Sequence, residues 1–197
     1  MSALLRLPRV IERTGLSRTV IYDRIKAGTF PPPVKLSERA SAWPEHEIEA
    51  CNAAQIRGRS KDEIRALVAR LQALDQQLAA ELAPVQQQPY IVFHDAYQYF
   101  ERRYALNAVG SVVLNPEQRP GAKRVAAIQA RIRDLKVRCV FSEPQFQPAL
   151  VGTVIAGSGA RTGVLDPLGA TLPAGPDAYF QLLQGLGAAL RGCLDAS

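Results

Sequence analysis

The chain has 197 residues and a formal net charge of +6. The excess of positive charge is concentrated in residues 1–60, which carry ten Lys/Arg against six Asp/Glu. The remaining residues carry fourteen Lys/Arg against twelve Asp/Glu. A small basic module beside a nearly balanced one indicates an anionic partner for the first, although solubility alone would explain the same charge. The sequence contains no apolar run of about 18 residues that would span a membrane. It also has too few cysteines for a disulfide scaffold and no secretory signal within Met1–Pro8, so we expect a cytoplasmic protein.

The first elements predict a helix-turn-helix. Pro8 favours the start of a short helix over Arg9–Arg13, and the turn 14–16 contains Gly15, which can adopt a positive φ. Ser17 is a typical N-cap for a second helix that runs to Ala27 and ends at Gly28. Two short helices joined by a glycine-containing turn are typical of DNA-binding modules.

The second helix is predicted to be amphipathic. Val20, Ile21 and Ile25 should face inward, against Leu7, Val10 and Ile11. The opposite face mixes cations for phosphates with side chains that can reach base edges in a major groove. A generic solvated helix would show a similar pattern, so this face alone leaves both interpretations open. Its residues are Arg18, Thr19, Tyr22, Asp23 and Lys26.

A small hairpin, or wing, should follow. After the stiff segment 30–33, alternation predicts strands over Val34–Leu36 and Ala40–Trp43, joined by a turn at 37–39. Lys35 and Arg39 would then be placed to contact phosphates. Pro44 at a first helical position, with acidic residues in the first turn, predicts a further helix through Ile56.

A long helix joins the two modules. Ser60 and Glu63 form an S-x-x-E capping box, and Pro84 cannot continue the helix. Between them lies one apolar stripe at spacings of three and four, typical of a helix packed on one or both modules. We therefore divide the chain into residues 1–60, 61–84 and 85–197. The stripe consists of Ile64, Leu67, Val68, Leu71, Leu74, Leu78 and Leu82.

Strands and helices alternate in the last module, which predicts an α/β lobe with a four-stranded parallel sheet covered on both faces. The predicted strands are Tyr90–Phe93, Gly110–Leu114, Val137–Phe141 and Gly163–Leu165, and the predicted helices are Asp95–Tyr104, Ala122–Leu135, Pro148–Ala156 and Ala178–Leu194.

Polar side chains follow the carboxyl ends of these strands, where ligands bind in such sheets. They are His94, Asn115, Glu143 and Asp166. An imidazole and carboxylates at one edge suit a divalent metal, although such residues often only cap helices. Asp95 we interpret as a helix cap.

Residues 3–70 resemble the AlpA family of prophage regulators, which have an excisionase-like winged helix-turn-helix. The resemblance implies binding of duplex DNA and transcriptional activation or excision control. From the face of the second helix and from the wing, the DNA-binding residues that we predict are Arg18, Thr19, Tyr22, Lys26, Lys35 and Arg39. The matching segments are Leu5–Pro8, Val10–Ser17, Ile21–Tyr22, Ile25–Gly28, Phe30–Pro31, Pro33–Leu36, Ala42–Trp43 and Asp62–Val68.

From about residue 70 to the end, the chain resembles the C-terminal lobe of ZnuA, the zinc-binding periplasmic receptor of a bacterial ABC importer. The resemblance implies that His94 is a zinc ligand, that Asp166 lies at the cleft, and that Cys139 and Cys193 match a pair that forms a disulfide in some members. The matching segments are Leu71–Asp75, Leu82–Val85, Pro89–Phe100, Asn115–Glu117, Pro120–Ala122, Cys139–Phe146 and Leu165–Gly169.

The chain departs from that family in its ligands. The receptor's N-terminal lobe, which supplies two further zinc histidines, is absent, and the other histidine, His46, we interpret as a surface residue. Because His94 and Asp166 cannot close a tetrahedral zinc site, zinc binding should be weak or need a second chain in a homodimer. In a reducing cytoplasm the Cys139–Cys193 disulfide should not persist.

No catalytic arrangement is evident, and Gly157-Ser158-Gly159 follows a helix rather than a strand, so it is not a dinucleotide fingerprint. We therefore expect no enzyme. The leading hypothesis is a cytoplasmic DNA-binding regulator fused to a truncated zinc-receptor lobe. The alternatives are a receptor fragment that serves an ABC importer permease, or a chimera without an evolved function.

Overall fold

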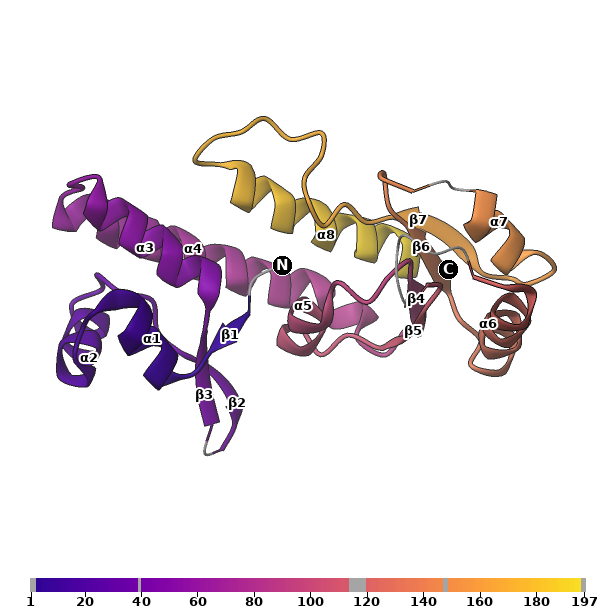
Figure 1. The fold of residues 1–197 in the computed structure, drawn as a ribbon, viewed down its shortest axis with the longest axis horizontal. Coiled ribbons are helices and arrows are strands. Elements are labelled where there is room, and N and C mark those ends of the chain that lie inside the picture. The colour runs from indigo at the N-terminus through magenta and orange to yellow at the C-terminus, as the bar shows by residue number, and fades with distance from the viewer. Residues whose placement is uncertain (1–2, 39, 114–119, 147–148, 196–197) are drawn as a thin grey trace. The chain divides into compact units, whose positions relative to one another are not determined.

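A computed structural model describes residues 3–38, 40–113, 120–146 and 149–195. The chain divides into two compact units, Ser2–Gln76 and Gln77–Ser197, and the division falls inside the long helix α4 (Lys61–Leu82). Figure 1 shows the elements of each unit. No helix in the described ranges is long and apolar enough to cross a membrane.

The first unit is a winged helix-turn-helix. Its antiparallel sheet has the order β1-β3-β2, and its helices precede and follow the hairpin. The elements before α4 are β1 (Leu4–Leu5), α1 (Leu7–Thr14), α2 (Arg18–Lys26), β2 (Val34–Ser37), β3 (Ala40–Pro44) and α3 (Glu45–Ile56).

An apolar cluster around Trp43 packs β1, β3 and the helices α1, α2 and α3 together, and a smaller one of Cys51, Ile64 and Val68 joins α3 to α4. Trp43 of β3 is 1% exposed, and its indole N–H donates to the Pro31 carbonyl at 2.9 Å, which fastens the proline segment to the sheet. Burying an aromatic side chain of this size is among the largest single contributions to a small core. The buried members of the cluster around Trp43 are Leu5, Val10, Ile21, Phe30, Trp43 and Ile48.

Three expectations for this unit were wrong. Leu4–Leu5 forms strand β1, paired with the end of β3, and the helix that follows spans Leu7–Thr14 rather than Arg9–Arg13. Pro44 is the N-cap of α3 rather than its first helical residue. Val20 is 38% exposed because α2 turns only Ile21 and Ile25 toward the core.

The capping box of α4 is confirmed. The Ser60 N–H donates to Glu63 Oε2 at 2.8 Å, and the Glu63 N–H donates to Ser60 Oγ at 3.2 Å, so two otherwise unpaired donors are satisfied. The apolar stripe is buried along the helix except at Leu67, which is half-buried. The α-helix ends at Leu82, and Pro84 lies in the short 3₁₀ helix η1 (Ala83–Val85) that follows.

The second unit confirms the predicted α/β lobe. Its four strands are parallel in the order β5-β4-β6-β7. Beyond the end of α4 and η1, its elements are β4 (Tyr90–Val92), α5 (Gln98–Arg103), β5 (Ala108–Ser111), α6 (Ala122–Asp134), β6 (Cys139–Ser142), α7 (Ala149–Ile155), β7 (Arg161–Val164) and α8 (Ala178–Leu194).

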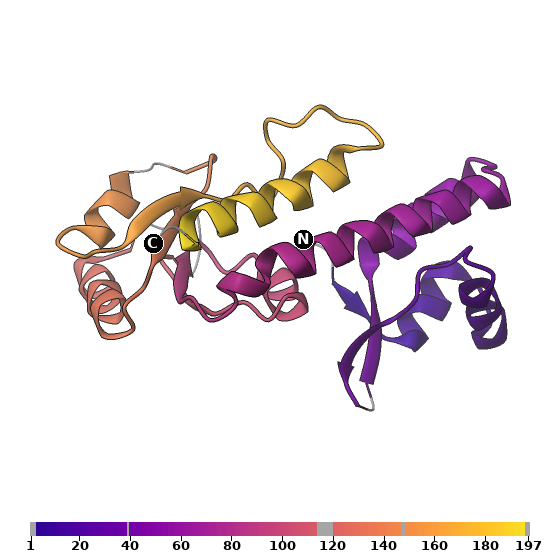
Figure 2. The same ribbon diagram turned by 180° about the vertical axis from the view of Figure 1, so that it is seen from behind.

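The central strands β4 and β6 are buried on both faces of the sheet, and their successive residues point to opposite sides. Ile91 and Val140 lie in one cluster with residues of α6 and α7. On the other face Tyr90 packs edge-on against Phe141, with ring centroids 5.7 Å apart. Figures 1 and 2 agree that α6 and α7 cover one face and α8 the other.

A disulfide joins the central sheet to the last helix. Cys139 of β6 is bonded to Cys193 of α8, and their Cα atoms lie 6.1 Å apart. The Arg161 guanidinium donates to the Cys193 carbonyl beside it. The third cysteine, Cys51, is free and buried in the first unit.

Candidate functional site

The face of α2 predicted to meet DNA is exposed. Its five residues, Arg18, Thr19, Tyr22, Asp23 and Lys26, are all exposed. Ser17 caps the helix by accepting the Val20 N–H at 3.4 Å, and Gly15, with φ of 66°, turns the chain from α1 into this cap. The turn and the cap therefore fix where this face begins.

The inner side of α2 is fixed to the later helices of the same unit. The Arg24 guanidinium donates to Gln55 Oε1 at 2.9 Å, and Arg65 Nε of α4 donates to the Ala27 carbonyl at 3.4 Å. These two arginines are therefore engaged in holding α2, which leaves Arg18 and Lys26 as its outward cations.

The wing adds a further cation. Lys35 lies on β2 and is exposed, and β2 pairs with β3 in an antiparallel hairpin as predicted. Leu36 beside it is 47% exposed. Arg39, the other residue predicted to contact phosphate, lies outside the described residues.

At the candidate metal edge, His94 is paired with Glu143. His94 Nδ1 lies 2.6 Å from Glu143 Oε1. Glu143 is 3% exposed, and its burial raises the pKa of its carboxyl, an effect that the neighbouring His94 opposes. This pairing orients the imidazole through Nδ1, and Nε2 is the ring nitrogen that Glu143 does not contact. The sequence placed both residues at this edge but did not predict the contact.

Asp166 is engaged in a turn. Its carboxylate accepts backbone N–H groups from Leu168 at 3.1 Å, Gly169 at 2.9 Å and Ala170 at 2.6 Å, and Gln145 Nε2 donates to it at 3.2 Å. A carboxylate with this many donors stabilises the turn and is poorly placed to become a metal ligand.

The predicted metal edge therefore does not form a closed site. Within the described residues, no group of three or more His, Cys, Asp or Glu side chains is arranged to hold a metal ion. Asn115 lies outside those residues. A tetrahedral zinc site needs four ligands, and His94 is the one well-placed donor here.

Two minor expectations were wrong. His46 is partly buried in the first unit rather than a surface residue, and burial lowers the pKa of its imidazole to about 4. Asp95 does not cap α5, which begins at Gln98 with Tyr97 in the N-cap position. Asp95 accepts a hydrogen bond from the Gln98 side chain at 3.1 Å instead.

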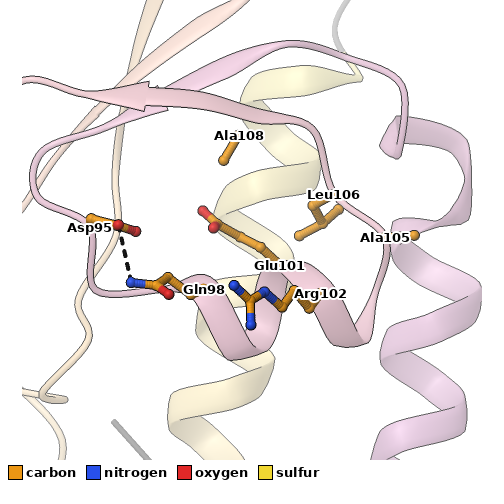
Figure 3. A pocket seen from close by; sticks show the side chains of 7 residues that line it. All are labelled: Asp95, Gln98, Glu101, Arg102, Ala105, Leu106 and Ala108. Carbon is orange, nitrogen blue, oxygen red and sulfur yellow. Dashed lines mark hydrogen bonds between the residues drawn. The ribbon is translucent and has the colours of Figure 1, made fainter. Parts of the chain in front are cut away.

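A pocket of about 450 Å³ lies between α5 and the loop that leads to β5 (Figure 3). Glu101 points into it and accepts a hydrogen bond from the Tyr90 hydroxyl at 3.2 Å. Burial raises the pKa of Glu101 to about 7. The other lining residues are Asp95, Gln98, Arg102, Ala105, Leu106 and Ala108.

The raised pKa of Glu101 predicts how stability depends on pH. The folded state holds the Glu101 proton up to about pH 7, whereas the unfolded chain releases it near the ordinary glutamate pKa of 4.5, so stability falls as pH rises between these values. Glu101→Gln removes this loss and keeps an acceptor for Tyr90. Because Glu101 is partly exposed, we expect a gain of about 1 kcal/mol at pH 8 and little change at pH 4, measured by urea unfolding. A gain of equal size at both pH values would contradict this assignment.

Comparisons with known families agree with both units. Residues 49–193 match the family model of ZnuA, described as zinc-uptake complex component A, periplasmic. The chain belongs to the ZnuA family. Residues 3–52 match the model of the prophage CP4-57 regulatory protein AlpA. The ZnuA match begins in α3, before the boundary near residue 70 that the sequence indicated, so all of α4 falls within it. Neither family is enzymatic: one is a regulatory protein and the other a binding component.

Curated ZnuA relatives match the second part of the chain. The high-affinity zinc uptake system protein ZnuA of Brucella abortus (strain 2308) is 56% identical over 125 residues, which is 64% of this chain and 37% of that protein. The Yersinia pestis ZnuA is 41% identical over 120 residues, 61% of this chain and 38% of that protein. The chain thus spans little more than a third of these relatives.

Solved structures support the fold of this ZnuA-family chain. A crystal structure of ZnuA has a TM-score of 0.60 and 25% identity, covering 76% of this chain and 55% of its own. The Zn(II)-bound AdcAII E280Q variant of Streptococcus pneumoniae has a TM-score of 0.59 and 23% identity, covering 76% and 56%. The latter protein binds zinc, whereas the described residues of this chain form no metal site.

Proposed function

We propose that this chain is a cytoplasmic DNA-binding transcriptional regulator whose ZnuA-type lobe binds metal weakly at most. The observation that carries the proposal is the exposed face of α2, beside a wing with its own exposed lysine. The match of residues 3–52 to AlpA supports it. A bacterial regulator of this kind meets its DNA in the cytoplasm, which is why we place the protein there.

The geometry suits a duplex because a helix of this size enters the major groove. Arg18 lies in the first turn of α2, where the N-terminal residues of a recognition helix contact base edges. Lys26 at its end and Lys35 on the wing are placed to contact phosphates, which position the protein without reading sequence.

The test uses the full chain and a fluorescein-labelled duplex, with binding followed by fluorescence anisotropy at 50 mM salt. Removing a phosphate contact should weaken binding to all sequences alike, so Lys26→Ala and Lys35→Ala should each lower affinity severalfold on specific and random duplexes. Arg18→Ala should also reduce the preference between duplexes.

Lys123→Ala is the matched control. Lys123 is an exposed lysine of α6 in the second unit, and its removal changes the net charge by the same amount. The affinity of this variant should remain within about twofold of the parent, since Lys123 does not belong to the unit that carries the proposed contacts. Equal losses in all three lysine variants would show that net charge alone drives binding and would contradict the proposal.

A second candidate function is zinc binding, which the match of residues 49–193 to ZnuA favours. In this hypothesis the lobe is a fragment of a receptor that delivers metal to an ABC importer permease. His94 would be its one anchored ligand, oriented by Glu143. A homodimer that brings two His94 side chains together would be needed to add ligands.

We predict that the monomer has no high-affinity zinc site. Zinc present at a hundred times its dissociation constant would add about 2.7 kcal/mol, or a rise in Tm on the order of 5–10 °C for a domain of this size. We expect micromolar zinc to shift the Tm of the full chain by less than that. A large shift that disappears in His94→Ala would overturn this prediction, and sedimentation would then show whether two chains share the metal.

A further inference from the structure

Three aromatic and cationic side chains form a continuous series from the core to the exposed face of α2. The Arg18 guanidinium carbon lies 5.8 Å from the centre of the Tyr22 ring. The Tyr22 ring packs edge-on against Trp43, with centroids 6.5 Å apart and planes at 70°. Trp43 is itself buried and hydrogen-bonded to the Pro31 carbonyl. Tyr22 therefore connects an exposed cation to a buried core residue.

The spacing explains why the contact forms. Arg18 and Tyr22 are four residues apart on α2, so their side chains lie on the same face one turn apart. Tyr22 is 37% exposed, which leaves its ring available to the guanidinium while its inner edge meets Trp43. A guanidinium at this distance from an aromatic ring is attracted to it.

Arg18 is also free of carboxylate partners among the described residues. By contrast, Arg9 pairs with Glu12 at 2.7 Å and Arg13 pairs with Glu45 at 2.7 Å in the same unit. A guanidinium that is oriented by a ring and unpaired with acid keeps all its donors for a ligand. An oriented side chain also loses less rotamer freedom when it binds.

We propose that Tyr22 is a positioning residue that holds Arg18 ready to read a guanine in the major groove. A guanidinium binds the O6 and N7 atoms of guanine with two hydrogen bonds, and this geometry requires a planar group held in one orientation. The inference rests on the proposed DNA-binding function and adds to it a base preference and the residue that supports it.

The test begins with selection of a preferred duplex from a randomised library by the full chain. Affinities are then measured for that duplex and for copies in which single guanines are replaced by 7-deazaguanine, which lacks the N7 acceptor. The proteins compared are the parent, Arg18→Ala, Tyr22→Phe, Tyr22→Leu and the double variant Arg18→Ala/Tyr22→Leu.

We expect one guanine at which 7-deazaguanine weakens the parent but not Arg18→Ala. Tyr22→Leu should lose about two- to fivefold in affinity for the preferred duplex, the range of an exposed cation–π contact. Tyr22→Phe, which keeps the ring, should lose less affinity than Tyr22→Leu. The double variant should bind no more weakly than Arg18→Ala, because Tyr22 acts through Arg18.

Additive losses of affinity in the double variant would overturn the inference. A loss of affinity in Tyr22→Phe equal to that in Tyr22→Leu would also overturn it, because it would show that the hydroxyl contacts DNA directly. Thermal melting of each variant shows whether it is folded, and Tyr22→Phe tests the idea even if Tyr22→Leu unfolds. If the parent binds DNA without any 7-deazaguanine effect, the positioning role fails and the proposed function stands. If the parent binds no duplex at 50 mM salt, both fail.

Discussion

Raising the monovalent salt concentration from 50 to 200 mM is expected to weaken binding of duplex DNA about fortyfold. Each phosphate that the protein neutralises releases counterions, so affinity falls with a logarithmic slope of about −0.9 per contact, and about three contacts produce this loss. The cations that we assign to those contacts are Lys26 and Lys35, together with Arg39, which lies outside the described residues.

The slope of log affinity against log salt concentration also reports the number of phosphate contacts, so the loss of a single contact can be measured. Lys26→Ala and Lys35→Ala should each make the slope shallower by about 0.9. Lys123→Ala, in the second unit, should leave it unchanged. Anisotropy titrations at five salt concentrations with a random duplex measure all four slopes. A parent slope near zero would mean that binding, if present, does not use the phosphate backbone, and would contradict the assignment of these lysines.

Reducing the Cys139–Cys193 disulfide is expected to lower the free energy of unfolding of the second unit by about 4 kcal/mol. The bond closes a loop with a sequence separation of 54, and a cross-link of that length restricts the unfolded chain strongly. Cys193→Ser should have a similar effect under oxidising conditions. Urea unfolding of the full chain, with and without reductant, measures the loss.

The two units can be followed separately because Trp43 is the protein's one tryptophan and is buried in the first unit. Tryptophan fluorescence should therefore show a transition that reductant does not move, whereas the circular dichroism signal from the helices of the second unit should shift. Cys51→Ala is the control, since Cys51 is free and should leave the effect of reductant intact. A reductant-independent circular dichroism transition would contradict the prediction.

This disulfide bears on the compartment. Burial raises the pKa of the free Cys51 thiol to about 12, so Cys51 is a poor thiolate source for exchange with the bonded pair. In a reducing cytoplasm the pair would be open, and the second unit would lose the stability that the bond contributes. Both cysteines of the bond lie in the second unit, so we expect the proposed DNA binding by the first unit not to depend on it.

Local signals in the sequence predicted the winged helix-turn-helix and its caps well. The hydrogen bonds of Ser17 and of the Ser60–Glu63 box join residues that are three positions apart, and the positive φ of Gly15 is a property of that residue alone. These features therefore follow from short-range chemistry. The alternation of strands with helices in the second half likewise predicted a parallel sheet, because parallel strands are joined by crossover helices that cover the sheet.

Contacts between distant residues could not be predicted in the same way. Strand β1 exists because Leu4 and Leu5 meet the far end of β3, about forty residues away. The sequence made Asp166 a plausible metal ligand, but in the structure its carboxylate accepts hydrogen bonds from three backbone N–H groups of the turn that follows it. The partnership of His94 with Glu143 joins two strand ends that only the folded sheet brings together.

The central claim is that DNA binds the α2 face and the wing of the first unit. Hydrogen–deuterium exchange of the full chain with and without a duplex at 50 mM salt tests it most directly, because it locates the interface along the chain. We predict slower exchange in peptides that cover α2 and the β2–β3 hairpin, and unchanged exchange in residues 77–195. Protection confined to residues 77–195, or none anywhere in the chain, would contradict the claim.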